Sequence, residues 1–191
     1  MKFESFRNAR VVRSDWLEEG GRRLDCNPYM SGALEARDAL QLLSARKDKL
    51  SDVTTAIFHS GRESRNWVDD SRYGVPFMGS SAISLADFST LPLISKKQIA
   101  RNASLVLHES WSLITRSGTI GRMAYVRPDM AGMACSEDVL KVAPDKSRIP
   151  PGFLYAFLSS KYGVPLVVAG TYGAIIQHIE PQHIGPIEIP R

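Results

Sequence analysis

Short apolar runs constrain the fold of this chain more than any other feature of the sequence. From Lys49 onward they occupy residues 53–58, 75–78, 105–107, 111–114, 123–126 and 139–142, separated by glycine, proline, asparagine and serine. Runs this short, bounded by turn-forming residues, are typical of β-strands. Their spacing predicts a strand-rich domain and does not fit the alternating strand–helix repeat of a parallel sheet.

A first helix is predicted over residues 32–46. Leu34, Ala39, Leu42 and Leu43 recur there near helical spacing, and Ser31 is placed to cap the first turn. This helix belongs to an N-terminal segment, residues 1–48, in which strand and helix signals are mixed. We expect that segment to pack on the main domain, residues 49–191.

A second helix is predicted over residues 153–160, with Leu154, Phe157 and Leu158 on its buried face. Two prolines and a glycine precede it, and Gly163 and Pro165 follow it, which is the usual order at helix ends. Residues 186–190 alternate apolar and polar side chains and predict a last strand. The fold class is therefore α+β, a strand-rich domain with a few helices.

Common catalytic and cofactor motifs are missing from the sequence. It contains no Gly-x-Ser-x-Gly nucleophile turn and no phosphate-binding loop, and residues 118–121 lack the third glycine of a dinucleotide-binding motif. Asn27-Pro28-Tyr29 lacks the second proline of the Asn-Pro-Pro-Tyr element of adenine methyltransferases. The acidic pairs at 69–70 and 137–138 are interpreted as solvated turns. We expect a non-catalytic protein.

Neither a cofactor, a metal ion nor a membrane is predicted as a partner. The four histidines and two cysteines are scattered, without the spacing of a zinc site. No apolar run approaches the roughly 20 residues of a membrane span. The first residues, Met-Lys-Phe-Glu-Ser, lack the apolar core of a signal peptide. A cytoplasmic location is expected.

Three glycine-containing loops carry groups that suit nucleic acid: residues 59–67, 115–122 and 170–178. Arginine binds guanine through paired hydrogen bonds, asparagine and glutamine bind adenine, and hydroxyl groups bind phosphate. The candidates for guanine or phosphate are Arg62, Arg65, Arg116 and Arg122, those for adenine are Asn66 and Gln177, and those that position the duplex are Ser64, Ser117, Thr119, Thr171 and Tyr172, with His178 completing the third loop. Polar surface loops that only cover a core have a similar composition, so both interpretations stay open.

Charge is unevenly distributed. Residues 96–127 contain six basic side chains, including Lys96 and Lys97, and one acidic side chain, Glu109. Such an excess is typical of a surface that follows the DNA backbone. A solvated face of alternating strands would have the same charge, and the sequence does not separate the two.

From Leu50 to the end, the chain resembles a target recognition domain of a type I restriction-modification DNA specificity subunit. The resemblance rests on ordered landmarks at residues 73–78, 81–83, 94–96, 117–121, 151–160, 172–175 and 187–190. Residues 22–29 also resemble the segment that precedes such domains. The resemblance to a target recognition domain implies a domain that reads one half of a split double-stranded DNA sequence.

The resemblance also implies partners. These are double-stranded DNA, a DNA methyltransferase subunit, a restriction (nuclease and translocase) subunit, and a second recognition domain or half-subunit. In that family a long helix follows the domain, whereas this sequence stops at Arg191. We therefore expect a fragment of a longer subunit or a half-subunit.

Within the resembling family, residues 117–121 recur in members that read different DNA targets. We therefore expect them to shape the fold or hold the backbone, while residues 59–67 and 170–178 choose the sequence. Two alternatives remain. One is a protein-interaction module of a phage-defence assembly, and the other is a nuclease or methyltransferase domain too divergent for its motifs to be recognised.

Overall fold

A computed structural model describes residues 13–15, 29, 31–171 and 178–191. Its strands are β1 (Lys47–Lys49), β2 (Thr54–Phe58), β3 (Trp67–Val68), β4 (Gly74–Met78), β5 (Leu93–Ser95), β6 (Ser112–Thr115), β7 (Met123–Tyr125), β8 (Ala134–Cys135), β9 (Val139–Pro144) and β10 (Glu188–Pro190). Its α-helices are α3 (Ala33–Gln41), α4 (Lys96–Arg101), α5 (Pro151–Leu158), α6 (Gly163–Ala169) and α7 (Pro181–Ile184). The 3₁₀ helices are η1 (Leu50–Asp52), η2 (Ser80–Ser84), η3 (Ala103–Leu105) and η4 (Pro128–Met130).

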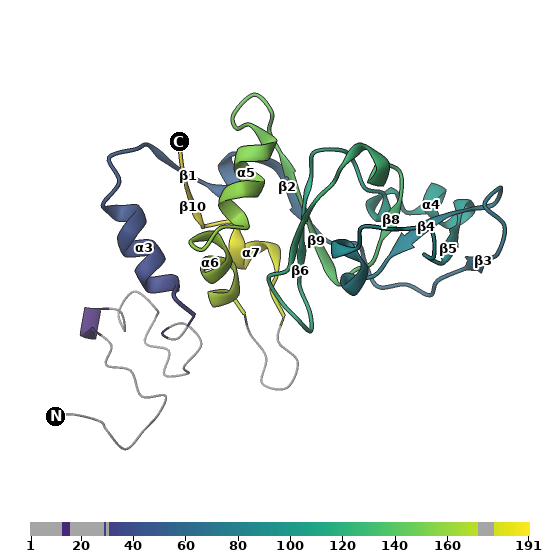
Figure 1. Cartoon of the computed structure of the whole chain (residues 1–191), viewed down its shortest axis with the longest axis horizontal. Helices are drawn as coiled ribbons and strands as arrows, with labels where there is room; N and C mark the ends of the chain where they lie inside the picture. Colours follow the sequence, from purple (N-terminus) through teal and green to yellow (C-terminus); the bar gives the residue numbers. More distant parts are fainter. Residues whose placement is uncertain (1–12, 16–28, 30, 172–177) are drawn as a thin grey trace, which may run out of the picture.

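Three small sheets follow one another along the long axis of the molecule (Figure 1). At one end β1 pairs with β10 beside α3, α5, α6 and α7. The antiparallel sheet β2–β9–β6–β7 forms the middle. The sheet β3–β5–β4–β8 forms the other end, and its β4–β8 pair is parallel. The α+β class predicted from the sequence is confirmed.

Strand β9 is the buried centre of the molecule. Every residue in it is buried, so the strand appears in the sequence as a continuous apolar run interrupted only by Lys141. Successive side chains of a strand point to opposite faces. Accordingly Leu140 and Val142 join the core beneath the helices, while Val139 joins a second core toward β4.

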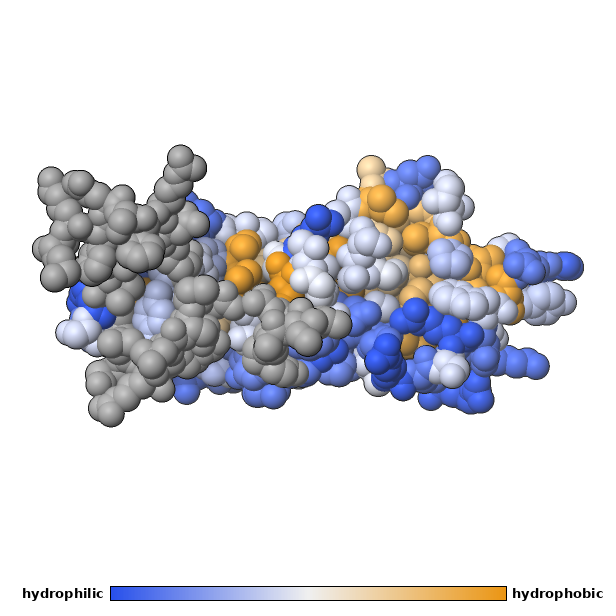
Figure 2. Space-filling view, turned by 90° about the horizontal axis from the view of Figure 1, so that it is seen from below, coloured by the Kyte–Doolittle hydropathy of each residue, from blue (hydrophilic) through white to orange (hydrophobic). Residues whose placement is uncertain are grey.

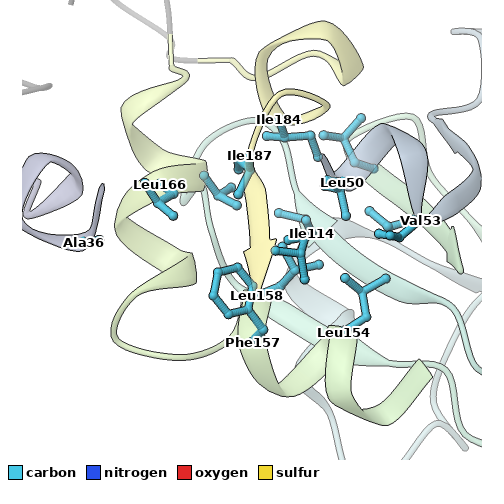
Figure 3. Close-up of a cluster of buried hydrophobic side chains, with 14 of the residues drawn as sticks. Ala36, Leu50, Val53, Ile114, Leu154, Phe157, Leu158, Leu166, Ile184 and Ile187 are labelled. Atoms are coloured by element: carbon cyan, nitrogen blue, oxygen red, sulfur yellow. The ribbon is translucent and has the colours of Figure 1, made fainter. Parts of the chain in front are cut away.

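The helical end packs on one face of this middle sheet. Figure 3 shows Leu154, Phe157 and Leu158 of α5 directed toward Ile114 of β6 and Ile187 near β10. Proline suits the first turn of a helix because its fixed φ is helical and the N–H groups of that turn have no acceptor within the helix, so the missing N–H of proline costs no hydrogen bond. Pro151 begins α5 accordingly, and the predicted buried face of this helix is confirmed.

The sheet β3–β5–β4–β8 has a smaller core of its own, made of Phe77, Ile94, Leu105 and Ala134. The neighbouring strand residues Met78 and Cys135 contribute instead to the second core with Val139. Adjacent residues of β4 and β8 thus join this end to the middle sheet. Seen from below in Figure 2, the surface of this end is hydrophilic along one side and apolar along the other.

The N-terminal helix is shorter than predicted. It ends at Gln41, and Leu42 and Leu43 are 88% and 46% exposed, because the chain must extend to form β1 opposite β10. Gly32 occupies the N-cap position, although the Ala33 N–H donates to Ser31 Oγ at 3.3 Å. The buried side of α3 packs against α6. The division of the chain at residues 48 and 49 stays a prediction.

The predicted strand at residues 105–107 is wrong. Ser104 Oγ donates to Asn102 Oδ1 and the Leu105 N–H donates to the Asn102 carbonyl at 3.2 Å, which closes the 3₁₀ helix η3. Val106 makes one isolated bridge, to Ala134. The sequence prediction also omitted β1, β3, β5, β8, α4, α6 and α7. Gly163 lies beyond the end of α5, as predicted, and begins the omitted helix α6.

Among the described residues, no single helix is long and apolar enough to cross a membrane. Helices α5 and α6 meet such a test only as a pair, with an angle of 67° between them. Leu154, Leu158, Leu166 and Val167 of this pair are core residues.

Candidate nucleic-acid interface

Two of the predicted loops meet at one polar groove. A hollow of about 370 Å³ is lined by His59, Ser60, Arg62, Arg116, Ser117, Glu137, Asp138 and His178. A second hollow of about 390 Å³ is lined by Arg62, Glu63, Arg65, Trp67, Glu137 and Asp138. The two share three residues, Arg62, Glu137 and Asp138. We name this continuous depression the polar groove.

Residues 115–122 form a tight turn between β6 and β7. Thr115 Oγ1 donates to the Thr119 carbonyl and accepts the Arg122 N–H at 3.0 Å. Gly118 and Gly121 have φ angles of 73° and 84°, a conformation that glycine adopts without a steric penalty. The glycines and Thr115 therefore shape the turn, and Ser117 is directed to the groove, where its Oγ donates to Asp138 Oδ1 at 2.8 Å.

Arg116 is a structural link in this conformation. Its side chain is 12% exposed and forms an ion pair with Glu180, while its Nε donates to the Ile179 carbonyl at 3.2 Å. His59 Nε2 lies 3.1 Å from the other oxygen of the Glu180 carboxylate. Glu180 also caps α7 through a reciprocal pair of bonds with His183. This geometry favours a positioning role for Arg116, in contrast to the predicted contact with guanine or phosphate.

Arg62 and Arg65 differ in how firmly other protein groups hold their side chains. Arg65 Nη2 donates to Glu137 Oε2 at 2.8 Å, and its guanidinium lies 4.7 Å from the centre of the Phe77 ring. The Arg62 side chain is 92% exposed, and its Nε is 3.8 Å from Glu137 Oε1. An exposed ion pair at this distance contributes little. Arg62 is therefore available to a ligand, whereas Arg65 is held.

The backbone of residues 64–66 is fixed by a buried glutamine. Gln98 Nε2 donates to the Ser64 carbonyl at 2.9 Å, and Gln98 Oε1 accepts the Asn66 N–H at 2.8 Å. The side chains of Ser64 and Asn66 are exposed. The loop thus presents these two predicted contacts to solvent on a backbone held from below.

A buried lysine anchors the start of the same loop. Lys141 Nζ donates to Ser60 Oγ at 2.8 Å, and Ser60 Oγ donates to the Ser104 carbonyl at 3.0 Å. Burial lowers the pKa of Lys141 because the charged ammonium loses water. Burial likewise raises the pKa of the Cys135 thiol to about 11. Sequence reasoning missed Lys141 because it lies inside an apolar run.

The basic stretch 96–127 does not form one surface. Lys96 and Lys97 are exposed on α4, at the far end of the molecule (Figure 1). Arg116 is paired within the groove, and Arg127 pairs with Asp129 at 2.8 Å. The basic side chains of this stretch therefore do not all lie on one surface, and contact of its exposed members with DNA phosphates stays a prediction.

The remaining candidates are distributed around the loops. Thr119 and Arg122 are exposed at the β6–β7 turn. Thr171 is 1% exposed, so its predicted contact with DNA does not fit this structure. His178 lines the polar groove and forms a β-bridge with Ser117. Tyr172 and Gln177 lie outside the described residues.

Sequence reasoning also missed the acidic members of the groove. Residues 137–138 do form a turn, but the interpretation that it is solvated is wrong for Glu137, which is 14% exposed and accepts the Arg65 guanidinium. The one available signal was position, since these carboxylates directly precede the apolar run at 139–142. Within the described parts of the chain, no group of three or more His, Cys, Asp or Glu residues is arranged to hold a metal ion.

No protein-family model and no curated protein matches the sequence. The fold is nevertheless similar to solved structures. The HsdS subunit from Thermoanaerobacter tengcongensis aligns with a TM-score of 0.58 and 15% identity over 85% of this chain. The type I restriction-modification S subunit from M. genitalium aligns with a TM-score of 0.53 and 12% identity over 78% of this chain.

A third structure comes from work on the assembly and conformational transition of the type I restriction-modification system. It aligns with a TM-score of 0.56 and 14% identity over 85% of this chain. The chain spans 39% of the length of the T. tengcongensis chain, 35% of the M. genitalium chain and 40% of the third chain. At these identities the likeness concerns the fold, and it relates this chain to a part of each aligned chain.

Proposed function

We propose that this chain binds double-stranded DNA and reads part of its sequence, as the target recognition domain of a type I restriction-modification specificity subunit or of a related phage-defence complex. The observation that carries the proposal is the polar groove. Members of two loops that the sequence singled out for their chemistry line it together with His178: His59, Ser60, Arg62, Glu63, Arg65 and Trp67 from residues 59–67, and Arg116 and Ser117 from residues 115–122. The similarity of the fold to two type I S-subunit structures and to a third structure from a type I restriction-modification system supports the same conclusion.

In the proposed complex, Arg62 is the leading contact because it is exposed and weakly paired. Ser64, Asn66, Thr119 and Arg122 are exposed on the same two loops. Lys96 and Lys97 at the far end would hold a more distant part of the DNA backbone. Gln98, Lys141 and Arg116 would keep the loops in place while contacts form.

The proposed role is non-catalytic. Methylation and cleavage would be carried out by separate methyltransferase and restriction subunits, and a second recognition domain or half-subunit would read the other half of the target. We also keep the expected cytoplasmic location as part of this proposal. The alternative is a protein-interaction module that does not read DNA.

Selection from random duplexes tests the proposal, because recognition enriches one sequence. The affinity for that sequence should fall steeply as salt rises, since each phosphate contact releases counterions. Failure to enrich any sequence, together with an affinity that ignores salt, would overturn DNA recognition. If the chain then still captured a purified methyltransferase subunit, the protein-interaction alternative would replace it.

Arg62→Ala is expected to weaken binding of the selected duplex by about 1–3 kcal/mol if Arg62 contacts a base. If Arg62 contacts a phosphate, the log–log salt slope should fall by about one for every sequence. Fluorescence anisotropy at several salt concentrations distinguishes these results. Arg46→Ala is the matched control, because Arg46 is also exposed and paired with one carboxylate but lies outside the groove. Equal affinities of the two variants would remove Arg62 from the interface.

A further inference from the structure

Asp138 is an uncompensated carboxylate in the polar groove. It lines both hollows and is partly exposed. Its Oδ1 accepts the Ser117 hydroxyl at 2.8 Å, and none of the described arginines or lysines forms an ion pair with it. A hydroxyl bond orients a carboxylate without cancelling its charge. Asp138 therefore keeps acceptor capacity that faces the groove.

The adjacent Glu137 differs, because it is nearly buried and neutralised. Arg65 pairs with it at 2.8 Å, and Arg62 lies 3.8 Å away. With Arg65 occupied in this way, Arg62 is the groove arginine whose donors are open. The shared wall of the groove thus presents one available donor group, Arg62, and one available acceptor group, Asp138.

An uncompensated carboxylate is unfavourable beside a DNA phosphate, since like charges repel. It is favourable beside a base that offers a donor, and in the major groove cytosine does so through its N4 amino group. Guanine, on the paired strand, offers the O6 and N7 acceptors that arginine binds with two hydrogen bonds. An arginine and an aspartate on one wall therefore match the major-groove acceptors of guanine and the major-groove donor of cytosine in a single G·C pair.

We infer that the polar groove reads a G·C base pair, with Arg62 donating to guanine and Asp138 accepting from cytosine. This inference rests on the DNA binding proposed above and adds the identity of one base pair in the target. Ser117 acts as a positioning residue, since its hydroxyl orients the Asp138 carboxylate. The tight turn that carries Ser117 thereby contributes to readout without touching a base.

Selection from random duplexes is carried out in parallel for the full chain, for Asp138→Asn and for Arg62→Ala. The wild type should enrich a motif that contains a G·C pair. Asparagine keeps an oxygen for the Ser117 bond but loses the charge, so Asp138→Asn should reduce discrimination at one G·C position about tenfold. Arg62→Ala should relax the same position, while the other positions of the motif keep their preference.

Asp52→Asn is the matched control. Asp52 is an exposed carboxylate that also accepts a serine hydroxyl, Ser51 Oγ at 3.2 Å, and it lies outside the groove. This variant should leave the motif unchanged. Circular dichroism on each variant shows whether the fold is retained. Arg62 is 92% exposed, so Arg62→Ala tests the preference at the same base pair without disturbing the packing of the core.

The outcomes separate the two proposals. A wild-type chain that enriches no sequence overturns DNA recognition and this inference with it. A wild-type motif that survives unchanged in Asp138→Asn and Arg62→Ala overturns the inference alone. An Asp138→Asn variant that binds every sequence more tightly, without a change in preference, also overturns it, because Asp138 would then only repel phosphate.

Discussion

At the scale of single residues, Lys141 is an ionisable group held in the buried interior of the molecule. It is fully buried on β9, and its hydrogen-bond partner is the neutral hydroxyl of Ser60 in place of a carboxylate. Its ammonium also lies 5.6 Å from the centre of the Phe58 ring. Such an arrangement sacrifices stability. Its bond to Ser60 indicates that it holds the start of the loop at residues 59–67.

Lys141→Met should stabilise the fold by about 1 kcal/mol at neutral pH and weaken DNA binding. Below the lowered pKa both the folded and the unfolded state hold the proton, so the burial penalty is fully present. Between the lowered pKa and the ordinary value of 10.5 the unfolded state binds more protons, so wild-type stability from this group rises with pH. The advantage of the variant should therefore shrink as the pH approaches 10.5.

Urea unfolding of both proteins at about pH 7 and about pH 10 measures this difference and cancels the titration of other groups. Lys146→Met, at an exposed position, is the control and should change little. An advantage of Lys141→Met that stays the same at both pH values would contradict the assignment of a lowered pKa.

At the scale of elements, the junction between α5 and α6 sets how the helical end packs. The two helices meet at 67° over a short connection. A Cβ atom at Gly163 would lie 2.2 Å from the Phe157 carbonyl oxygen and 2.4 Å from that of Leu158. Both neighbours are backbone atoms, which cannot move aside without shifting α5. Only glycine permits the close approach at this corner.

Gly163→Ala should destabilise the fold by about 3 kcal/mol, since the added methyl group overlaps backbone atoms. Gly152→Ala is the matched control within α5, because a Cβ there meets nothing within 4 Å. Alanine is the better helix former, so the control should be unchanged or more stable by up to about 1 kcal/mol. Thermal unfolding followed by circular dichroism compares them, and equal melting temperatures would refute the steric argument.

At the scale of the whole molecule, pairing between distant segments closes the fold. Strand β1 pairs with β10 in the register Lys47 to Pro190, Asp48 to Ile189 and Lys49 to Glu188. The Leu50 N–H also donates to the Ile187 carbonyl at 2.8 Å. Ile189 is fully buried in the main core. The last residues therefore stabilise the same core that α5 and β6 build.

Ile189→Ala should lower the free energy of unfolding by about 3 kcal/mol through the cavity it leaves. Glu188→Ala, at the exposed neighbouring position, should change it by less than about 0.5 kcal/mol. The urea midpoints of the two variants give the comparison, at equal slopes. A similar loss in both would mean that the pairing of backbones, and not the buried side chain, provides the stability.

Strands whose side chains pack in a core could be predicted from the sequence, whereas elements that depend on pairing with distant residues could not. The runs at 53–58, 75–78, 111–114, 123–126 and 139–142 became β2, β4, β6, β7 and β9 because each contributes side chains to a core or packs beside one. Strand β1, with the sequence Lys-Asp-Lys, has no local signal, since its extended form depends on residues 188–190. Residues 105–107 are apolar enough for a strand, but local hydrogen bonds donated to Asn102 by the Ser104 hydroxyl and the Leu105 N–H close a 3₁₀ turn.

The polar groove could likewise be predicted only in part. Residue chemistry identified the loops at 59–67 and 115–122, because donor groups are visible in the sequence. It could not identify what holds them. The bond from Arg65 to Glu137 spans 72 residues, that from Lys141 to Ser60 spans 81, and that from Arg116 to Glu180 spans 64. Such partners are set by the pairing of β2, β9 and β6, which no local pattern encodes.

The pairing of β1 with β10 has one more consequence. The Arg191 N–H donates to the Arg46 carbonyl at 2.7 Å, so residues 46 and 191 lie next to each other in the fold. A unit with adjacent ends can be inserted into a host protein at a single position, or exchanged for another such unit, without rearrangement of the host. Residues 46–191 thus form a closed segment whose two ends lie side by side, with α3 packed on its core from outside that closure.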